Sequence, residues 1–219
     1  GARNLIARYT KQGDRFTRQD LTGDHASNIY GLQTTLKPGV VAYEHSTASK
    51  PAQWYAGTLS GAAVSDVQTV TNINSGLDNK KISKTEVVSW IGALDEKVDG
   101  ILYYPHNYEA GRKYPLVVMI HGGPSGVDQD DWGESWAYPH QLYTQRGAFI
   151  LKPNYHGSSN YGLKFVESIS RGKYNDLEWI DVEKGVDALI AKGLVDPDQM
   201  GIMGWSNGSI ITIEITTRT

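Results

Sequence analysis

Residues 200–213 read Met-Gly-Ile-Met-Gly-Trp-Ser-Asn-Gly-Ser-Ile-Ile-Thr-Ile and carry the strongest structural signal in the chain. A short apolar strand, Met200–Met203, runs into the pattern Gly-x-Ser-x-Gly, and the isoleucines that follow can extend as a buried helix. A sharp strand-to-helix turn of this kind strains the backbone of its central serine, Ser206, and exposes the hydroxyl at the edge of a sheet. We predict a nucleophile elbow here, in which a Cβ at Gly204 or Gly208 would crowd the neighbouring strand or helix. An ordinary Gly/Ser turn is the alternative.

Two further apolar runs, Leu116–Ile120 and Ala148–Leu151, precede the elbow. Runs without polar residues are typical of strands buried on both faces, as in a parallel sheet. A helix with one apolar stripe is expected over 180–190, with Gly193 ending it, and a turn at 196–198 leads into Met200–Met203. Strand, crossover helix and strand in this order predict an α/β fold.

The sequence His121-Gly122-Gly123-Pro124 follows the Leu116–Ile120 run directly. A Gly-Gly pair at the carboxyl end of a buried strand leaves main-chain N–H groups free to point into a cleft. Acyl transfer needs two such donors for the oxyanion of its tetrahedral intermediate, and we expect them to come from Gly123 and Asn207. A plain glycine turn is the alternative.

None of the chain's histidines follows Ser206, although the elbow architecture orders its triad as Ser, then Asp or Glu, then His. His121 precedes the serine, so we interpret it as a positioning residue rather than the base. Asp181 and Asp187 lie on the expected crossover helix and are interpreted as structural. The first residue is Gly1 rather than Met, and Ile210–Thr219 stop without a cap, a turn or a polar tail, so we expect both ends to lie inside folded units. The triad Asp and His are then expected outside this chain.

The first 83 residues have a different character, with short strand-like runs such as Asn4–Tyr9, Val40–Glu44, Gln53–Leu59 and Val67–Ile73 separated by turn residues. Leu21 and Leu59 lie in similar Leu-Thr/Ser-Gly segments 38 residues apart. A period near 40 is typical of β-propeller blades, at roughly 40–50 residues each. Spacing alone leaves another antiparallel β domain open.

Composition excludes several classes of protein. The net charge is −3, which is too mild and mixed to indicate a nucleic-acid partner. Cysteine is absent, so disulfides and thiolate chemistry are excluded, and no spacing typical of metal ligands or a cofactor is present. No apolar run is long enough to span a membrane. The acidic stretch at Asp128, Asp130, Asp131 and Glu134 is expected to be a solvated loop.

Three groups of residues together resemble the prolyl oligopeptidase family of serine peptidases, above all its acylaminoacyl-peptidase and dipeptidyl-peptidase-like members. They are Tyr114-Pro115-Leu116 running into His121–Pro124, then Asn154-Tyr155-His156-Gly157-Ser158 with Tyr161-Gly162, then 196–198 running into Gly204–Gly208. The resemblance implies that residues 84–219 are the N-terminal portion of an α/β-hydrolase domain, truncated after the elbow, and that residues 1–83 are the last strands of a β-propeller. The family usually has Arg where His156 stands, and often Gly where Ser209 stands.

The resemblance implies a serine peptidase that hydrolyses short peptides through an acyl-enzyme on Ser206, with Asn207 and Gly123 lining the oxyanion hole and no cofactor or metal. The 219 residues alone are expected to be inactive because they lack a base. Two alternatives remain: an α/β-hydrolase esterase, and an inactive fragment or binding module. Oligomeric state, compartment and cleavage preference are not predicted from this sequence.

Overall fold

The computed structural model describes residues 1–219 as two compact units. Unit 1 contains Gly1–Ala2, Lys81–Gln129 and Gly133–Thr219, and unit 2 contains Arg3–Lys80 with Asp130–Trp132. The main division falls between residues 80 and 81, three residues before the expected boundary. The identity of each part as a domain stays a prediction.

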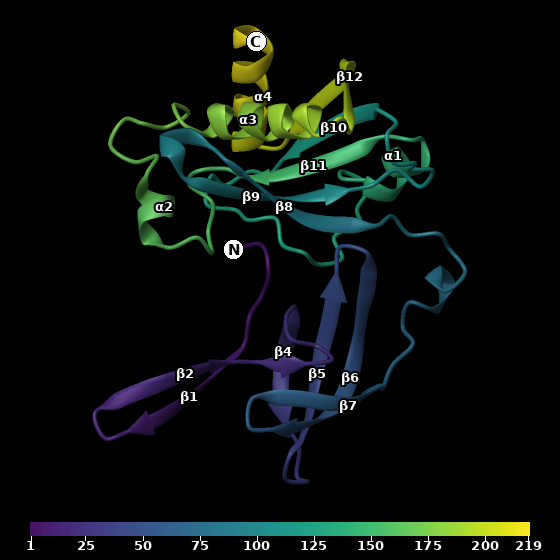
Figure 1. Ribbon diagram of the computed structural model, residues 1–219, viewed down its shortest axis with the longest axis vertical. Helices are drawn as coiled ribbons and strands as arrows, with labels where there is room; N and C mark the ends of the chain where they lie inside the picture. The colour runs from purple at the N-terminus through teal and green to yellow at the C-terminus, as the bar shows by residue number, and fades with distance from the viewer. The chain divides into compact units, whose positions relative to one another are not determined.

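Unit 1 is built on a five-stranded mixed sheet with the order β12-β10-β11-β9-β8 (Figure 1). β10 is parallel to both β11 and β12, so the three apolar runs are strands of one parallel arrangement, as the sequence predicts. β9 joins β11 antiparallel, and β8 joins β9 antiparallel. The strands of this sheet are β8 (Thr85–Ile91), β9 (Lys97–Tyr103), β10 (Tyr114–Ile120), β11 (Phe149–Asn154) and β12 (Val195–Gly204).

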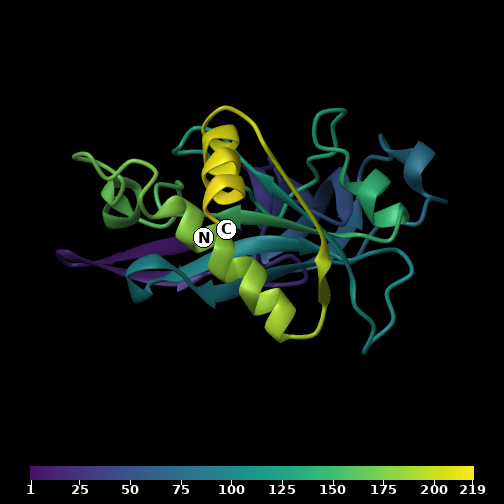
Figure 2. The same ribbon diagram turned by 90° about the horizontal axis from the view of Figure 1, so that it is seen from above.

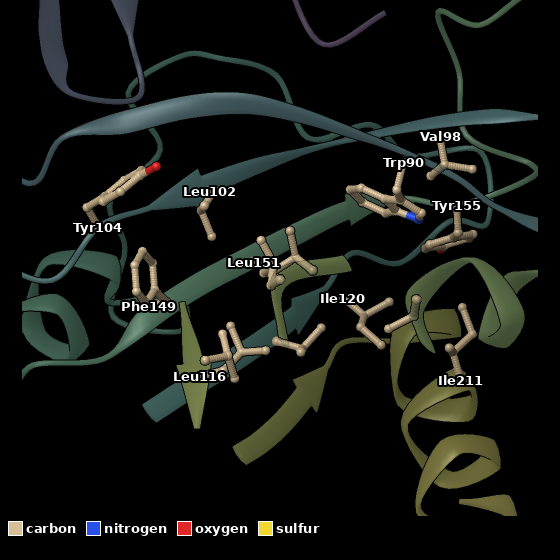
Figure 3. Close-up of a cluster of buried hydrophobic side chains, with 14 of the residues drawn as sticks. Trp90, Val98, Leu102, Tyr104, Leu116, Ile120, Phe149, Leu151, Tyr155 and Ile211 are labelled. Atoms are coloured by element: carbon tan, nitrogen blue, oxygen red, sulfur yellow. The ribbon is translucent and has the colours of Figure 1, made fainter. Parts of the chain in front are cut away.

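Two helices, α3 (Glu178–Ala191) and α4 (Asn207–Arg218), lie on one side of this sheet and cross its strands (Figures 1 and 2). Between helices and strands lies the main hydrophobic cluster of unit 1 (Figure 3). Each fully buried Leu or Ile there contributes about 1.5–3 kcal/mol. The cluster includes Leu116, Val118 and Ile120 of β10, Phe149 and Leu151 of β11, Val182 and Leu189 of α3, and Ile211 of α4.

The expected crossover helix is α3, and its C-terminus shows why the chain turns where it does. Gly193 has a φ of +71°, and its N–H bonds the carbonyl of Ile190 at 2.8 Å. A left-handed residue just past a helix end is typically glycine because a Cβ is strained there. The remaining helices of unit 1 are short: the 3₁₀ turn Ala93–Asp95, α1 (His140–Gln145) and α2 (Leu163–Glu167).

The strand before the elbow differs from the expectation of burial on both faces. β12 is an edge strand, paired only with β10, and Met200 is 48% exposed. The turn at 196–198 lies inside β12 as an irregularity, since Val195 pairs with Tyr114 but Met200 pairs with Leu116. The helix after the elbow is likewise only half-covered. Ile211 is fully buried, whereas Ile213 is 63% exposed.

Unit 2 is all β, apart from one 3₁₀ turn at Ser75–Leu77, and contains two sheets. A hairpin of β1 (Ala7–Gln12) and β2 (Arg15–Asp20) stands alone, and a five-stranded sheet has the order β3-β7-β6-β5-β4 (Figure 1). Strands β4 to β7 form an antiparallel meander, each paired with the next. The bounds of the second sheet are β3 (Thr22–Gly23), β4 (Ile29–Thr34), β5 (Val40–Thr47), β6 (Lys50–Ser60) and β7 (Ala63–Thr69).

The two leucine segments of unit 2 are not structurally equivalent. Leu21 precedes the short β3, whereas Leu59 lies near the end of β6, at the hairpin to β7. Both side chains pack into the same small core. The 38-residue spacing therefore separates two residues of one core that lie at different positions relative to their strands.

An aromatic cluster in unit 2 contains two stacked imidazoles. The rings of His25 and His45 lie parallel, with centroids 3.8 Å apart, and Tyr43 bonds Nδ1 of His25 at 3.1 Å. Burial, followed by the charges of His45 and Lys50, lowers the pKa of His25 to about 4. The stack is therefore neutral near pH 7.

Candidate active site

Ser206 lies at the turn between β12 and α4, immediately before the first residue of the helix. Its backbone has φ +54° and ψ −118°, a region that side-chain-bearing residues rarely adopt. The residue is exposed, and its hydroxyl makes no hydrogen bond within the chain. A strained serine with a free hydroxyl is the geometry that a strand-to-helix elbow imposes.

The two glycines of the elbow are required by its packing. A Cβ built on Gly204 would lie 2.2 Å from the carbonyl oxygen of Gly208 in the first turn of α4. A Cβ on Gly208 would lie 2.2 Å from the carbonyl oxygen of Ile120, the last residue of β10. Both obstacles are main-chain atoms, which cannot move aside without moving the helix or the strand.

The loop after β10 lies against the elbow. A Cβ on Gly122 would be 2.7 Å from the carbonyl oxygen of Trp205 and 3.0 Å from Cβ of Ser206. Gly123 has a φ of +140°, and a Cβ there would lie 2.4 Å from the N atom of Gly126. The structure therefore brings the glycine loop and the serine together, as two adjacent parallel strands with a common carboxyl edge require.

The amides expected to bind an oxyanion have no acceptor within the chain. The N–H of Asn207 belongs to the unpaired first turn of α4, where helices leave donors without partners. The N–H of Gly123 likewise donates to no atom of the chain. The positive end of the α4 dipole also favours negative charge beside Ser206.

His121 does not face the serine. Its ring stacks on Tyr155 with centroids 4.5 Å apart, and Nε2 lies 3.1 Å from the Ser158 hydroxyl. Nδ1 lies 2.9 Å from the carbonyl oxygen of Gly122. Burial lowers the pKa of His121 and so favours the neutral ring. The ring therefore contacts the glycine loop through Gly122 and does not act on Ser206.

The other histidines of unit 1 are also engaged away from Ser206. His106 contacts Gln141 through Nε2 at 3.1 Å, and His140 contacts Glu134 through Nδ1 at 3.0 Å. His156 is fully buried against Asp181, with Nδ1 2.7 Å from Oδ2. No histidine of this chain therefore serves Ser206 as a proton acceptor in this structure.

The buried His156–Asp181 pair lies away from Ser206 and is a feature of unit 1 that the sequence analysis did not predict. Oδ2 of Asp181 also accepts the His156 N–H at 2.6 Å, and Oδ1 accepts the Ala93 N–H at 2.7 Å. Burial disfavours the imidazolium, but the hydrogen bond and charge of Asp181, together with Glu96, outweigh it and raise the pKa of His156. The signal was the position itself, because the family usually has a cation, Arg, where His156 stands.

The acidic stretch is not a solvated loop. Asp128 pairs with Lys152 at 2.7 Å, and both side chains are nearly buried. Asp130, within unit 2, is buried and accepts hydrogen bonds from the Ala48 N–H at 3.0 Å and from Asn28 at 3.2 Å. These carboxylates are anchored because loops that pack against other segments must pair their buried charges.

The chain has neither a metal-binding cluster nor a helix that could cross a membrane. No three His, Asp or Glu side chains of the chain are grouped so that they could hold a metal ion. No helix combines the length and the apolar character that crossing a membrane requires.

Comparison with known proteins points to one family. The sequence model of the prolyl oligopeptidase family matches residues 135–219. YuxL, an uncharacterized peptidase of Bacillus subtilis, is 32% identical over 139 residues, which are 63% of this chain and 20% of that protein. Dipeptidyl-peptidase 5 of Porphyromonas endodontalis is 30% identical over 120 residues, or 54% of this chain and 17% of that protein. The chain thus spans about a fifth of the length of these curated relatives.

The fold is also found in a solved structure. The acylaminoacyl peptidase of Pyrococcus horikoshii superimposes with a TM-score of 0.69 at 22% identity, covering 87% of this chain and 29% of that one. At this identity the likeness concerns the fold alone.

Proposed function

Because this chain belongs to the prolyl oligopeptidase family of peptidases, we propose that Ser206 is the nucleophile of a serine peptidase that cleaves short peptides. The observation that carries the proposal is the strained backbone of Ser206, with φ +54°, packed against the Gly122–Gly123 loop. Strain of this kind costs about 1–3 kcal/mol and persists where the surroundings impose it.

In the proposed mechanism, Oγ of Ser206 attacks the scissile carbonyl and forms a tetrahedral intermediate. The N–H groups of Gly123 and Asn207 bind its oxyanion, and each donor is worth about 3 kcal/mol of barrier lowering. Collapse of the intermediate expels the amine and leaves an acyl-enzyme, which water then hydrolyses by the same route.

The base and its orienting acid are proposed to come from residues outside these 219. The hydrogen bonds and ring contacts of His106, His121, His140 and His156 support this, because each ring has partners other than Ser206. A histidine takes the serine proton and returns it to the leaving amine, and an aspartate holds its tautomer. We expect the 219 residues alone to lack meaningful peptidase activity.

Residues 1–83 are proposed to be the last strands of a β-propeller. The meander β4–β7 supports this, since four consecutive antiparallel strands over residues 29–69 match the ~40–45 residues of a blade. Such a domain would restrict access to the site and favour short peptides. The name of one similar protein, a dipeptidyl-peptidase, agrees with a peptide substrate.

The test is labelling of the full-length protein with a fluorophosphonate probe. We expect one labelled serine, Ser206, with labelling lost in Ser206→Ala and kept in Ser209→Ala, which alters the other serine of the same turn. Undiminished labelling of Ser206→Ala, or none in the unaltered protein, would refute the proposal. Comparing turnover of peptide amides with aryl esters tests the esterase alternative.

A further inference from the structure

A chain of three hydrogen bonds joins the residues around the proposed oxyanion site. The Tyr174 hydroxyl donates to Oδ1 of Asn207. Nδ2 of Asn207 donates to the Tyr155 hydroxyl at 3.4 Å, and that hydroxyl donates to the main-chain carbonyl of His121 at 2.9 Å. Each group donates a hydrogen bond to the next, from Tyr174 through Asn207 and Tyr155 to the carbonyl of His121.

These bonds connect the carboxyl ends of all three parallel strands. His121 is the first residue after β10 and Tyr155 is the first after β11, whereas Asn207 opens α4 three residues after Gly204, the last residue of β12. Asn207 is only 2% exposed and Tyr155 is fully buried, as Figure 3 shows for Tyr155 within the core. Burial strengthens each bond and makes a missing partner costly.

Both proposed oxyanion donors are attached to this hydrogen-bonded chain. One donor is the N–H of Asn207 itself, and the other, the N–H of Gly123, lies two residues beyond His121. Burial raises the pKa of both Tyr155 and Tyr174, so the two hydroxyls keep their protons near pH 7 and act as donors. Amides aimed at an oxyanion lose effect when their direction changes slightly.

We propose that the side chain of Asn207, clamped between the hydroxyls of Tyr155 and Tyr174, is a positioning element that aims the Asn207 and Gly123 amides at the oxyanion. The proposal rests on the function proposed above. Tyr174 is the accessible end of the clamp, because it is 45% exposed and lies in the loop between α2 and α3. Its hydroxyl can be removed without opening the core.

The experiment is Tyr174→Phe in the full-length protein, with Tyr143→Phe as the matched control, since the Tyr143 hydroxyl makes no hydrogen bond within the chain. For Tyr174→Phe we expect kcat to fall about fivefold to tenfold, the loss of one hydrogen bond, with KM changed less than twofold. A peptide aldehyde forms an adduct with Ser206 that carries an oxyanion. Its inhibition constant should rise by the same factor, because binding becomes weaker. The affinity for a cleaved product peptide should not change.

A merely structural role predicts something else, namely a lower thermal midpoint with kcat and aldehyde binding kept. That result, or equal kcat values for Tyr174→Phe and Tyr143→Phe, would overturn the proposal. Asn207→Ala keeps the main-chain N–H but removes both clamp bonds, and should lower kcat more than Tyr174→Phe does. If the unaltered protein is not labelled at Ser206, the proposed function has failed. If the unaltered protein is labelled at Ser206 but its kcat equals that of Tyr174→Phe, only the clamp proposal has failed.

Discussion

Asp181 and Asp187 lie on the same helix, but their surroundings predict opposite outcomes for the same substitution. Asp181 is fully buried and accepts the N–H groups of Ala93 and His156 as well as Nδ1 of His156. Asp187 is exposed and has no hydrogen bond or ion pair. Asn replaces Asp at nearly constant volume, so the comparison isolates charge and hydrogen bonding.

Asp181 has two oxygens that accept hydrogen bonds, one from Ala93 and one from His156. In Asp181→Asn only one side-chain oxygen remains as an acceptor for these donors. The NH₂ group then faces either Ala93 or His156, and at least one buried donor loses its acceptor at a cost of about 1–3 kcal/mol. His156 also loses its nearer charged partner, while Glu96 stays 3.6 Å from Nε2. Removing one member of a buried ion pair costs about 3–5 kcal/mol, and this figure already includes the lost hydrogen bond. We therefore expect the free energy of unfolding to fall by about 3–5 kcal/mol. Asp187→Asn should change it by less than about 0.5 kcal/mol.

The assay is urea unfolding of the unaltered protein, Asp181→Asn and Asp187→Asn, with tryptophan fluorescence as the readout. The buried Trp90 is a local reporter, because its Nε1 donates to the main-chain carbonyl of Asp181 at 2.8 Å. Equal losses in the two variants, or a loss below about 1 kcal/mol in Asp181→Asn, would refute the reasoning.

The pH dependence of unfolding gives a second measure of the same pair. The folded pKa of His156 is raised, so its stabilising contribution is fully present below the unfolded value of about 6.5. That contribution is lost as pH rises through the folded pKa. Asp181→Asn should flatten this decline, whereas Asp187→Asn should keep it. An unchanged pH slope in Asp181→Asn would mean that His156 does not carry the extra proton.

Two other predictions concern the elbow and unit 2. Ser206→Gly should raise the free energy of unfolding by about 1 kcal/mol, because relief of the backbone strain exceeds the added entropy of glycine, while Ser209→Gly inside α4 should lower it by about 0.5–1 kcal/mol. Chemical denaturation measures both, and a loss in Ser206→Gly would show that its backbone is not strained. The folded pKa of His25 is lowered to about 4, so unit 2 should lose stability as pH falls from about 6.5 towards 4. His25→Asn should reduce this acid-induced shift in the thermal midpoint, and an identical shift would contradict the assignment.

Local patterns in the sequence were sufficient for the elements and pairings around the candidate site. The Leu116–Ile120 run predicted a parallel strand because a central strand covered on both faces must be apolar throughout, and β10 has parallel neighbours on both sides. Gly204 and Gly208 lie where the main chain of one element approaches another so closely that any side chain would obstruct it. Only glycine fits such positions, so the residue type in the sequence indicates the close approach.

The exposure of some side chains and the partners of the buried charges depend on contacts between segments that are far apart in the sequence. Met200 looked like a core residue, but within these 219 residues it is half-exposed because β12 pairs with β10 alone, and the apolar run does not record how many neighbours its strand has. The pairing of His156 with Asp181, 25 residues apart, and the burial of Asp130 by residues some 80 to 100 positions away are likewise invisible in local patterns. Hydrophobic periodicity records which face of an element is covered, whereas a buried charge is compatible with the fold only through the partner that tertiary contacts supply.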